Sequence, residues 1–477
     1  MGLALTDHHV SSDTQDPPRP WTILILLAVA QFMVVLDITV VNVALPSIGA
    51  DLGLGGGDLQ WVVTIYVLLT GGLLLLGGRL ADAISRRGVF LTGLMIFTVA
   101  SLASGLAQSG STLIAARAAQ GVGAALLTPA ALSIVTSYYT GRQLTTALAT
   151  WSAIGSAGAA VGVLVGGMLT TWLSWEWIFL VNVPVGLVAL VAAPRILPAV
   201  PATRRGLDLP GAVLVVAGMI ALVYAIDGAT EHGWGSGRTL GLIALSLALL
   251  ALFARVEASV AQPLVPSPTW RNRPLIGGSA VVLGVTAILV GTFFLNSLYM
   301  QEVIGASALE TGLGFLPLAF AIGLAAHLAP RVMARLGSRA LIVAGMALVA
   351  AGALALAAAP ERASYAPDLL PGLVVIGLGV GFVFPGASVT AFSTVDLHQM
   401  GLASGLISTA HELGAALGVA ILAAVAAIAT ATDPAALSVG YEDGFIAAAA
   451  IALAFAAIAA TAVPSVRPAA GASAPVH

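Results

Sequence analysis

The feature of this sequence that most constrains its fold is a series of long apolar segments, each long enough to cross a lipid bilayer. A hydrocarbon core of about 30 Å is crossed by a helix of about 20 apolar residues. Charged residues make up only 8% of the chain, whereas soluble domains carry about 25%. Helices satisfy their own backbone hydrogen bonds in lipid. The sequence therefore predicts an all-α protein that crosses the membrane many times.

The apolar segments fall into groups of six, two and six. They cover residues 21–45, 60–79, 88–107, 112–136, 144–171 and 177–197, then 208–227 and 239–257, and finally 275–300, 309–330, 340–359, 368–392, 400–430 and 443–463. We predict 14 transmembrane helices from this grouping. They form a six-helix bundle at residues 21–200, a two-helix insert at 201–268 and a second bundle at 269–464, with tails at 1–20 and 465–477.

The arginines predict the orientation of these helices. Basic residues gather in cytoplasmic loops. With both tails in the cytoplasm, the arginines fall on inner segments except Arg238 and Arg362 in outer loops and Arg117 within a helix. Residues 1–18 lack the basic region of a secretory signal, so we expect the first helix to be permanent. The abundance of Ala and Gly suggests a GC-rich bacterial genome, and hence a bacterial cytoplasmic membrane.

The two predicted bundles contain a weak internal repeat. Residues 330–345 align with residues 78–93, and Arg331 then falls on Arg79 and Arg339 on Arg87. Each copy lies between the second and third helices of its bundle. Repeated halves are common in secondary transporters, which bind their substrate between the halves near the bilayer midplane.

Three ionisable residues inside predicted helices are candidates for proton coupling. A carboxylate within a membrane helix costs about 2.5–3.5 kcal/mol on insertion scales, and it usually faces the protein interior. Asp37 and Arg117 lie at similar depths, at a rise of about 1.5 Å per residue, and could form a pair. Glu412, beside His411, lies near the middle of the thirteenth helix. A buried pair with a purely structural role remains the alternative for Asp37 and Arg117.

Other residue sets suggest a gate, a packing surface and a substrate cavity. The loop GGRLADAISRR contains the candidate cytoplasmic gate, Gly78, Arg79, Asp82, Arg86 and Arg87; ordinary inner-loop charge would explain only its arginines. Glycines spaced by three and four allow close helix packing, and they are Gly155, Gly158, Gly162 and Gly166. Polar and aromatic residues that could line a cavity are Gln31, Asn42, Trp61, Tyr66, Gln120, Asn296 and Tyr299.

Several of these segments resemble the major facilitator superfamily, in particular its 14-helix drug:proton antiporters. LDITVVNVALP (36–46) resembles the first-helix motif, and residues 78–87 resemble the loop motif. Residues 113–125 match the fourth-helix pattern L-x-x-x-R-x-x-Q-G-x-G-x-A, and segments 175–186 and 401–420 are also similar. The resemblance implies the major-facilitator fold, proton coupling by Arg117, binding of a proton or of substrate by Asp37, and a gating role for Asp82.

The sequence departs from the family pattern at a few positions. Ser85 and Ala83 replace a usual Gly and a common basic residue in the loop, and Glu176 stands where Arg is usual. In the fifth helix Val163 follows Gly162, where the antiporters have Pro. The bend that Pro helps to impose is therefore expected to be weaker.

The sequence thus predicts a proton-coupled exporter of small lipophilic or cationic compounds, with membrane lipid around it, acting as a monomer. Alternatives are a facilitator or uptake carrier for a metabolite, and a flippase for lipids or lipophilic molecules. We expect no enzyme activity, no cofactor, no metal and no nucleic-acid partner. The chain has no Cys, no phosphate-binding loop and no set of nucleophile and base.

Overall fold

The computed structural model describes residues 20–139, 141–197, 208–260, 263–360, 363–395, 399–427 and 434–466. Most of the two predicted tails, and Arg362, lie outside these ranges. The described part is helical, and its α-helices are α1 Pro20–Leu52, α2 Gly56–Ala83, α3 Arg86–Gly105, α4 Gly110–Tyr138, α5 Gly141–Trp172, α6 Trp177–Leu180, α7 Asn182–Ile196, α8 Leu209–His232, α9 Gly237–Glu257, α10 Arg273–Leu298, α11 Ala308–Leu336, α12 Ser338–Ala357, α13 Leu370–Phe392, α14 Met400–Ala427 and α15 Pro434–Ala462. Short turns of other helix types stand at Ser267–Arg271, Tyr299–Val303 and Tyr365–Leu369.

These helices confirm the predicted fold class. Within the described residues, 13 segments are long and apolar enough to cross a membrane, and α6 and α7 together make one of them, Trp177–Ile196. Helix α5 supplies the remaining predicted crossing. The helices begin and end close to the predicted apolar segments, although α1 and α15 are longer.

Local residues explain where several helices begin. Ser109 and Thr112 form a capping box at the start of α4, as do Ser307 and Glu310 at the start of α11. Such caps satisfy backbone N–H groups that have no partner in the first turn. Gly53, between α1 and α2, has a φ of 64°, a conformation in which a side chain would be strained.

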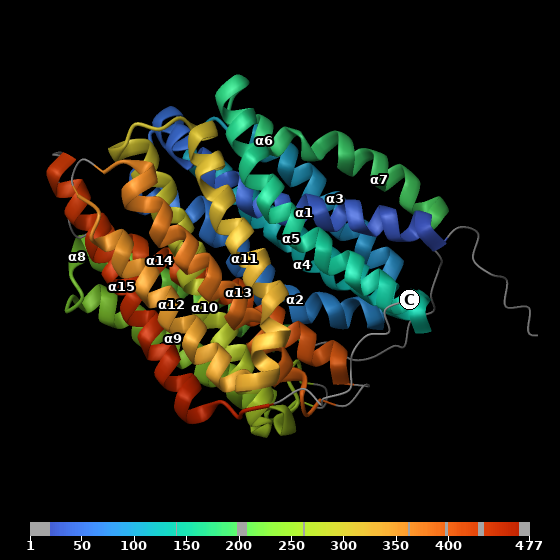
Figure 1. The fold of residues 1–477 in the computed structure, drawn as a ribbon. Coiled ribbons are helices and arrows are strands. Elements are labelled where there is room, and N and C mark those ends of the chain that lie inside the picture. Colours follow the sequence, from blue (N-terminus) through green and yellow to red (C-terminus); the bar gives the residue numbers. More distant parts are fainter. Residues whose placement is uncertain are drawn as a thin grey trace, which may run out of the picture.

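The two bundles meet at one end and separate at the other. We call α1–α7 the N half, α10–α15 the C half and α8–α9 the insert. The tail face is the side on which α1 begins and α15 ends, and the far face is the opposite side. In Figure 1 the helices of the two halves converge at the far face and diverge toward the tail face.

Polar contacts join the halves at the far face. Ser297 Oγ donates to the carbonyl of Asn42 at 2.6 Å, and Gln301 Nε2 donates to the carbonyl of Val43 at 2.9 Å. The backbone N–H of Leu309 donates to Thr171 Oγ1 at 3.1 Å. These bonds connect α1 with the end of α10, and α5 with α11.

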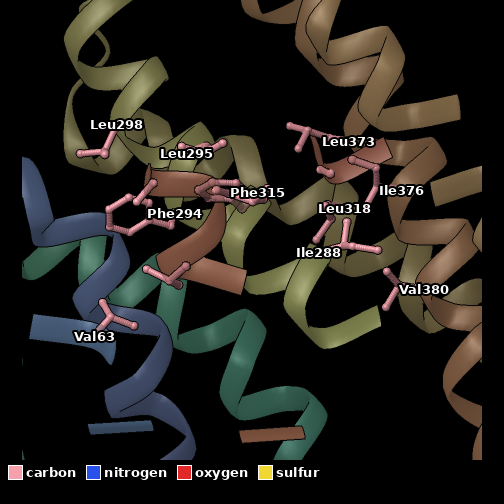
Figure 2. Packing of buried hydrophobic residues seen from close by; sticks show 14 of the residues in the cluster. Val63, Ile288, Phe294, Leu295, Leu298, Phe315, Leu318, Leu373, Ile376 and Val380 are labelled. Atoms are coloured by element: carbon pink, nitrogen blue, oxygen red, sulfur yellow. The ribbon is translucent and has the colours of Figure 1, made fainter. Parts of the chain in front are cut away.

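A hydrophobic cluster lies across the same contact. It includes Val40 and Val63 from the N half together with Phe294, Phe315 and Ile376 from the C half. Figure 2 shows Val63 and Phe294 among the labelled residues of this cluster, and the stacked rings of Phe293 and Phe315 have centroids 4.0 Å apart. The far-face closure is therefore mainly apolar, and a few hydrogen bonds add to it.

Candidate functional site

Asp37 of α1 and Arg117 of α4 form an ion pair inside the N half. Arg117 Nη1 donates to Asp37 Oδ2, and both side chains are fully buried. The sequence predicted that the two residues lie at similar depth, and the structure places them in direct contact. A charged pair in an apolar interior needs close geometry and additional hydrogen bonds to offset its desolvation.

The second oxygen of Asp37 has partners that sequence reasoning only partly identified. Gln120 Nε2 donates to Asp37 Oδ1 at 2.7 Å, and Asn182 Nδ2 donates to the same atom at 3.1 Å. Gln120 Nε2 also lies 2.9 Å from Ser101 Oγ. Side chains of α4 and α7 therefore bind the carboxylate of α1 directly, and α3 is connected to it through Gln120. Asn182 and Ser101 were missed. Each is a polar side chain in an apolar segment, and Asn182 also lies in segment 175–186, which resembles the family.

Arg117 also has partners other than Asp37. Its Nε donates to the carbonyl of Val62 at 2.9 Å, and its Nη1 lies 2.7 Å from Gln120 Oε1. The guanidinium carbon lies 4.1 Å from the ring centroid of Tyr66 and 5.6 Å from that of Phe179. Aromatic faces attract a cation at such distances. The guanidinium can thus remain stabilised when the charge of Asp37 changes.

The predicted glycine face packs on α1 on both sides of Asp37. A Cβ added to Gly158 would lie 3.1 Å from a methyl group of Val35, and one added to Gly166 would lie 2.9 Å from the carbonyl oxygen of Val40. Gly162 faces Thr39 and the carbonyl of Leu36. The surroundings of Gly155 lie outside the described residues. The three glycines bring the backbone of α5 against the helix that carries Asp37.

Glu412 of α14 faces the N half. Its side chain is 14% exposed, its Oε2 has no hydrogen-bond partner, and its Oε1 lies 3.5 Å from His411 Nδ1. Its Cβ stands directly opposite Gly71 of α2, where an added Cβ would overlap it. The His411 side chain is 41% exposed and its ring centroid lies 5.9 Å from that of Phe384. Glu412 is therefore a carboxylate at the contact between the halves.

The loop between α2 and α3 forms contacts with several neighbouring segments. Arg86 donates to Asp82 Oδ1 at 3.2 Å, and Ser133 Oγ of α4 donates to the same oxygen at 3.4 Å. Arg87 donates to the carbonyl of Leu197 at 3.2 Å, and Arg79 donates to the carbonyl of Pro263 at 2.8 Å.

A Cβ added to Gly78 would lie 3.6 Å from the Cβ of Pro129, which is an ordinary contact. Ser85, one of the departures from the family pattern, caps α3 by accepting from the N–H of Gly88.

The structure distributes the seven cavity candidates over several environments. Gln120 and Tyr66 belong to the Asp37–Arg117 site. Asn42 Nδ2 donates within its own helix to Ile38, and Asn296 Nδ2 to Thr292. Tyr299 OH donates to the carbonyl of Pro360 at 3.4 Å, and Gln31 is buried with an unpartnered Oε1.

Trp61, the seventh candidate, contacts the insert. Its Nε1 donates to Asp227 Oδ2 at 3.1 Å. The predicted helix ended at Asp227, but α8 continues to His232, so Asp227 lies within the helix and not at its end. Asp227 was therefore not among the predicted membrane acids.

Comparisons with known proteins agree with this fold. The model of the Major Facilitator Superfamily matches residues 27–419. The chain is 42% identical to the puromycin resistance protein pur8 of Streptomyces alboniger, over 92% of this chain and 89% of that one. It is also 42% identical to the cephamycin export protein CmcT of Amycolatopsis lactamdurans, over 92% of this chain and 91% of that one.

A solved structure supports the fold independently. The crystal structure of a peptide transporter, POT, in complex with sulfate superposes with a TM-score of 0.66 at 17% identity, covering 93% of this chain and 96% of that chain. At this identity the likeness concerns the fold alone. The family match over most of the sequence and the two close relatives show that this chain belongs to the major facilitator superfamily.

Proposed function

We propose that this chain exports small lipophilic or cationic compounds, antibiotics among them, from a bacterial cytoplasm in exchange for protons. The tail face lies in the cytoplasm, and the halves open alternately to the two sides of the membrane. Relatives named for puromycin resistance and cephamycin export support the class of substrate. The convergence of the halves at the far face is consistent with a state open toward the cytoplasm.

The observation that carries the proposal is the buried pair of Asp37 and Arg117. Proton binding to Asp37 removes the charge that holds Arg117, while Asn182 and Gln120 still have Oδ1 as an acceptor. Arg117 keeps the carbonyl of Val62, Gln120 Oε1 and two aromatic faces. The pair can therefore open on protonation without leaving an unsolvated cation. Opening changes how α1 and α4 are held together.

Glu412 is the carboxylate at which substrate and proton would compete. Its partly exposed side chain carries an unpartnered oxygen at the contact between the halves. A cationic substrate that binds there favours the deprotonated carboxylate, and a proton displaces it. Because Glu412 would bind either a proton or the substrate but not both, the flux of one is coupled to the flux of the other. Each ligand shifts the equilibrium between the two conformational states only through its different affinity for them.

The proton gradient is strong enough for this exchange. One proton that enters across 100 mV releases about 2.3 kcal/mol from the electrical potential. Because each 1.4 kcal/mol is a factor of ten in concentration ratio, this potential alone sustains roughly a fortyfold gradient of a neutral substrate.

The test is drug accumulation in everted membrane vesicles, with puromycin as the first probe and lincomycin as the second. We expect uptake driven by an acidic lumen, abolished by nigericin and valinomycin together in potassium buffer, and reduced at least tenfold in Asp37→Asn. Asp58→Asn, which changes an exposed carboxylate in the first turn of α2, is the matched control and should behave like the wild type. Uptake that the two ionophores together leave unchanged would identify a facilitator instead.

A further inference from the structure

The insert is tied to α2 by a partly buried polar contact near the far face. Asp227 of α8 accepts from Gln60 Nε2 through Oδ1 and from Trp61 Nε1 through Oδ2. The rings of Trp61 and Tyr224 have centroids 6.2 Å apart, and Arg238 of α9 donates to Tyr224 OH at 2.9 Å. Both carboxylate oxygens of Asp227 are therefore used to bind α2, and α9 is connected to the same group.

A second polar contact ties the insert to α2 near the tail face. Glu257, the last residue of α9, accepts from the backbone N–H groups of Leu264 and Val265 at 3.0 and 2.9 Å. Arg79 of α2 donates to the carbonyl of Pro263 at 2.8 Å. The segment after α9 is thus held between the end of the insert and the candidate gate loop.

Between these two ends, α8 packs closely on α2. A Cβ added to Gly72 would lie 2.6 Å from a methyl group of Val216, so the absence of a side chain at Gly72 lets α8 approach. Ser246 of α9 donates to the carbonyl of Gly218 in α8 at 2.8 Å. The insert is therefore held to α2 at both ends and at Gly72, and α9 packs on α8.

The packing of α8 toward the C half has a different character. Met219, Val223 and Ile226 of α8 belong to one hydrophobic cluster with residues of α14. Ala415, Ala416, Ala420 and Ala424 are buried in this cluster, and the larger Leu413, Leu417 and Ile421 are only partly buried against it. Apolar contacts are not directional, and methyl-sized side chains leave a smooth helix surface. Displacement along such a surface breaks no hydrogen bond, whereas displacement of α8 along α2 breaks those of Asp227.

We infer that the insert moves as part of the N half and slides along α14 when the transporter changes state, and that Asp227 is the positioning residue that fixes it to α2. This inference rests on the proposed transport cycle. The insert then covers the seam between α2 and α14, where Glu412 faces Gly71, throughout the cycle. Asp227 acts through Gln60 and Trp61 and does not itself carry protons.

A disulfide between α2 and α8 tests whether the insert moves with the N half. The chain has no Cys, so in a double-Cys variant no other thiol can form a cross-link. The Cβ positions at residues 72 and 216 lie 3.7 Å apart, against a mean of about 3.8 Å in disulfides. We expect Gly72→Cys/Val216→Cys to cross-link with copper phenanthroline and to export puromycin within about twofold of its reduced form, since the bond joins parts that do not move relative to each other.

A cross-link between the halves is the matched control. Thr171→Cys/Leu309→Cys joins α5 to α11 at the far face, and its cross-link should reduce export at least tenfold and reversibly. The inference would be refuted if Gly72→Cys/Val216→Cys lost export when oxidised but not when reduced. It would also be refuted if that pair failed to cross-link. Absence of export by the wild-type chain, which has no Cys, would reject the proposed function instead.

A rescue experiment separates positioning by Asp227 from a role in proton transfer. Asp227→Ala removes both acceptors, and we expect export to fall about fivefold or more. If Asp227 only fixes the insert, the disulfide of Gly72→Cys/Val216→Cys should restore export in the triple variant to within about twofold. If the triple variant cross-links but its export is not restored, Asp227 has another role. The cross-linking test above does not depend on how well Asp227→Ala folds.

Discussion

At the scale of single residues, Arg117 is the centre of the site. Besides Asp37 it contacts a backbone carbonyl, an amide oxygen and two aromatic rings, and its Nη2 has no hydrogen-bond partner. The guanidinium of Arg117 is thus stabilised by several groups besides Asp37, but one of its nitrogens makes no hydrogen bond. This arrangement suits a pair that opens during a transport cycle better than one that serves only to join helices.

Removing one member of the pair should cost more stability than removing both. Loss of a single partner of a buried pair costs about 3–5 kcal/mol, because an unpaired charge remains. We expect Arg117→Gln to lower the unfolding temperature in detergent clearly and the double variant Asp37→Asn/Arg117→Gln to lower it much less. Tryptophan fluorescence on heating measures this. Both variants should fail to export drug, and additive losses of stability would contradict the account.

The charged pair could be predicted from sequence because helix depth fixes the height of each residue. Its environment could not. Asn182 and Ser101 belong to α7 and α3, and only the tertiary packing of four helices brings them to Asp37 and Gln120. Asp227 was missed because its helix continues five residues beyond the predicted end, and helix ends are the least certain part of any sequence-based prediction.

At the scale of the helix, α5 connects the site to the contact between the halves. Its glycines at 158, 162 and 166 face α1. On its other side α5 contacts α11, where a Cβ added to Gly312 would lie 2.7 Å from the carbonyl oxygen of Val163. The helix runs from Gly141 to Trp172 without an internal Pro, in line with the replacement of the family's Pro by Val163. The glycine spacing predicted which face of α5 packs closely, but the sequence did not indicate that α1 is the partner.

Adding a methyl group to this face should disturb both packing and transport. Gly166→Ala places a Cβ 2.9 Å from the carbonyl oxygen and 3.0 Å from the Cα of Val40, and overpacking typically costs about 1–3 kcal/mol. Gly241→Ala in α9 is the control, because its Cβ meets nothing within 4 Å. Thermal unfolding and drug export should both decline in Gly166→Ala only. Equal behaviour of the two variants would contradict the assignment of this packing surface.

At the scale of the whole molecule, the halves touch at the far face and separate toward the tail face. The hydropathy pattern predicted the number and order of the helices because each must cross the same thickness of lipid. It could not predict the conformational state, since one sequence supports two arrangements that differ by a few kcal/mol. Nor did it place the insert against α2 and α14, because the lipid-facing and buried sides of an apolar helix have similar composition.

Weakening the far-face closure should shift this equilibrium. Ser297→Ala/Gln301→Ala removes the donors to the carbonyls of Asn42 and Val43. At about 1 kcal/mol for each bond, the population open at the far face should rise roughly tenfold or more. Electron–electron distance measurements between spin labels at exposed Asp58 and Ala366 would detect it. Thr461→Ala, which loses only hydrogen bonds within its own helix, should leave the distance distribution unchanged.

The central claim is that drug export is exchanged for protons through the membrane carboxylates. The most direct measurement is proton movement on addition of puromycin to proteoliposomes with a pH dye inside, for the wild type, Asp37→Asn and Glu412→Gln. We expect substrate addition to release protons in the wild type and in neither variant. Drug flux without proton movement, unchanged in both variants, would contradict the account and leave a facilitator.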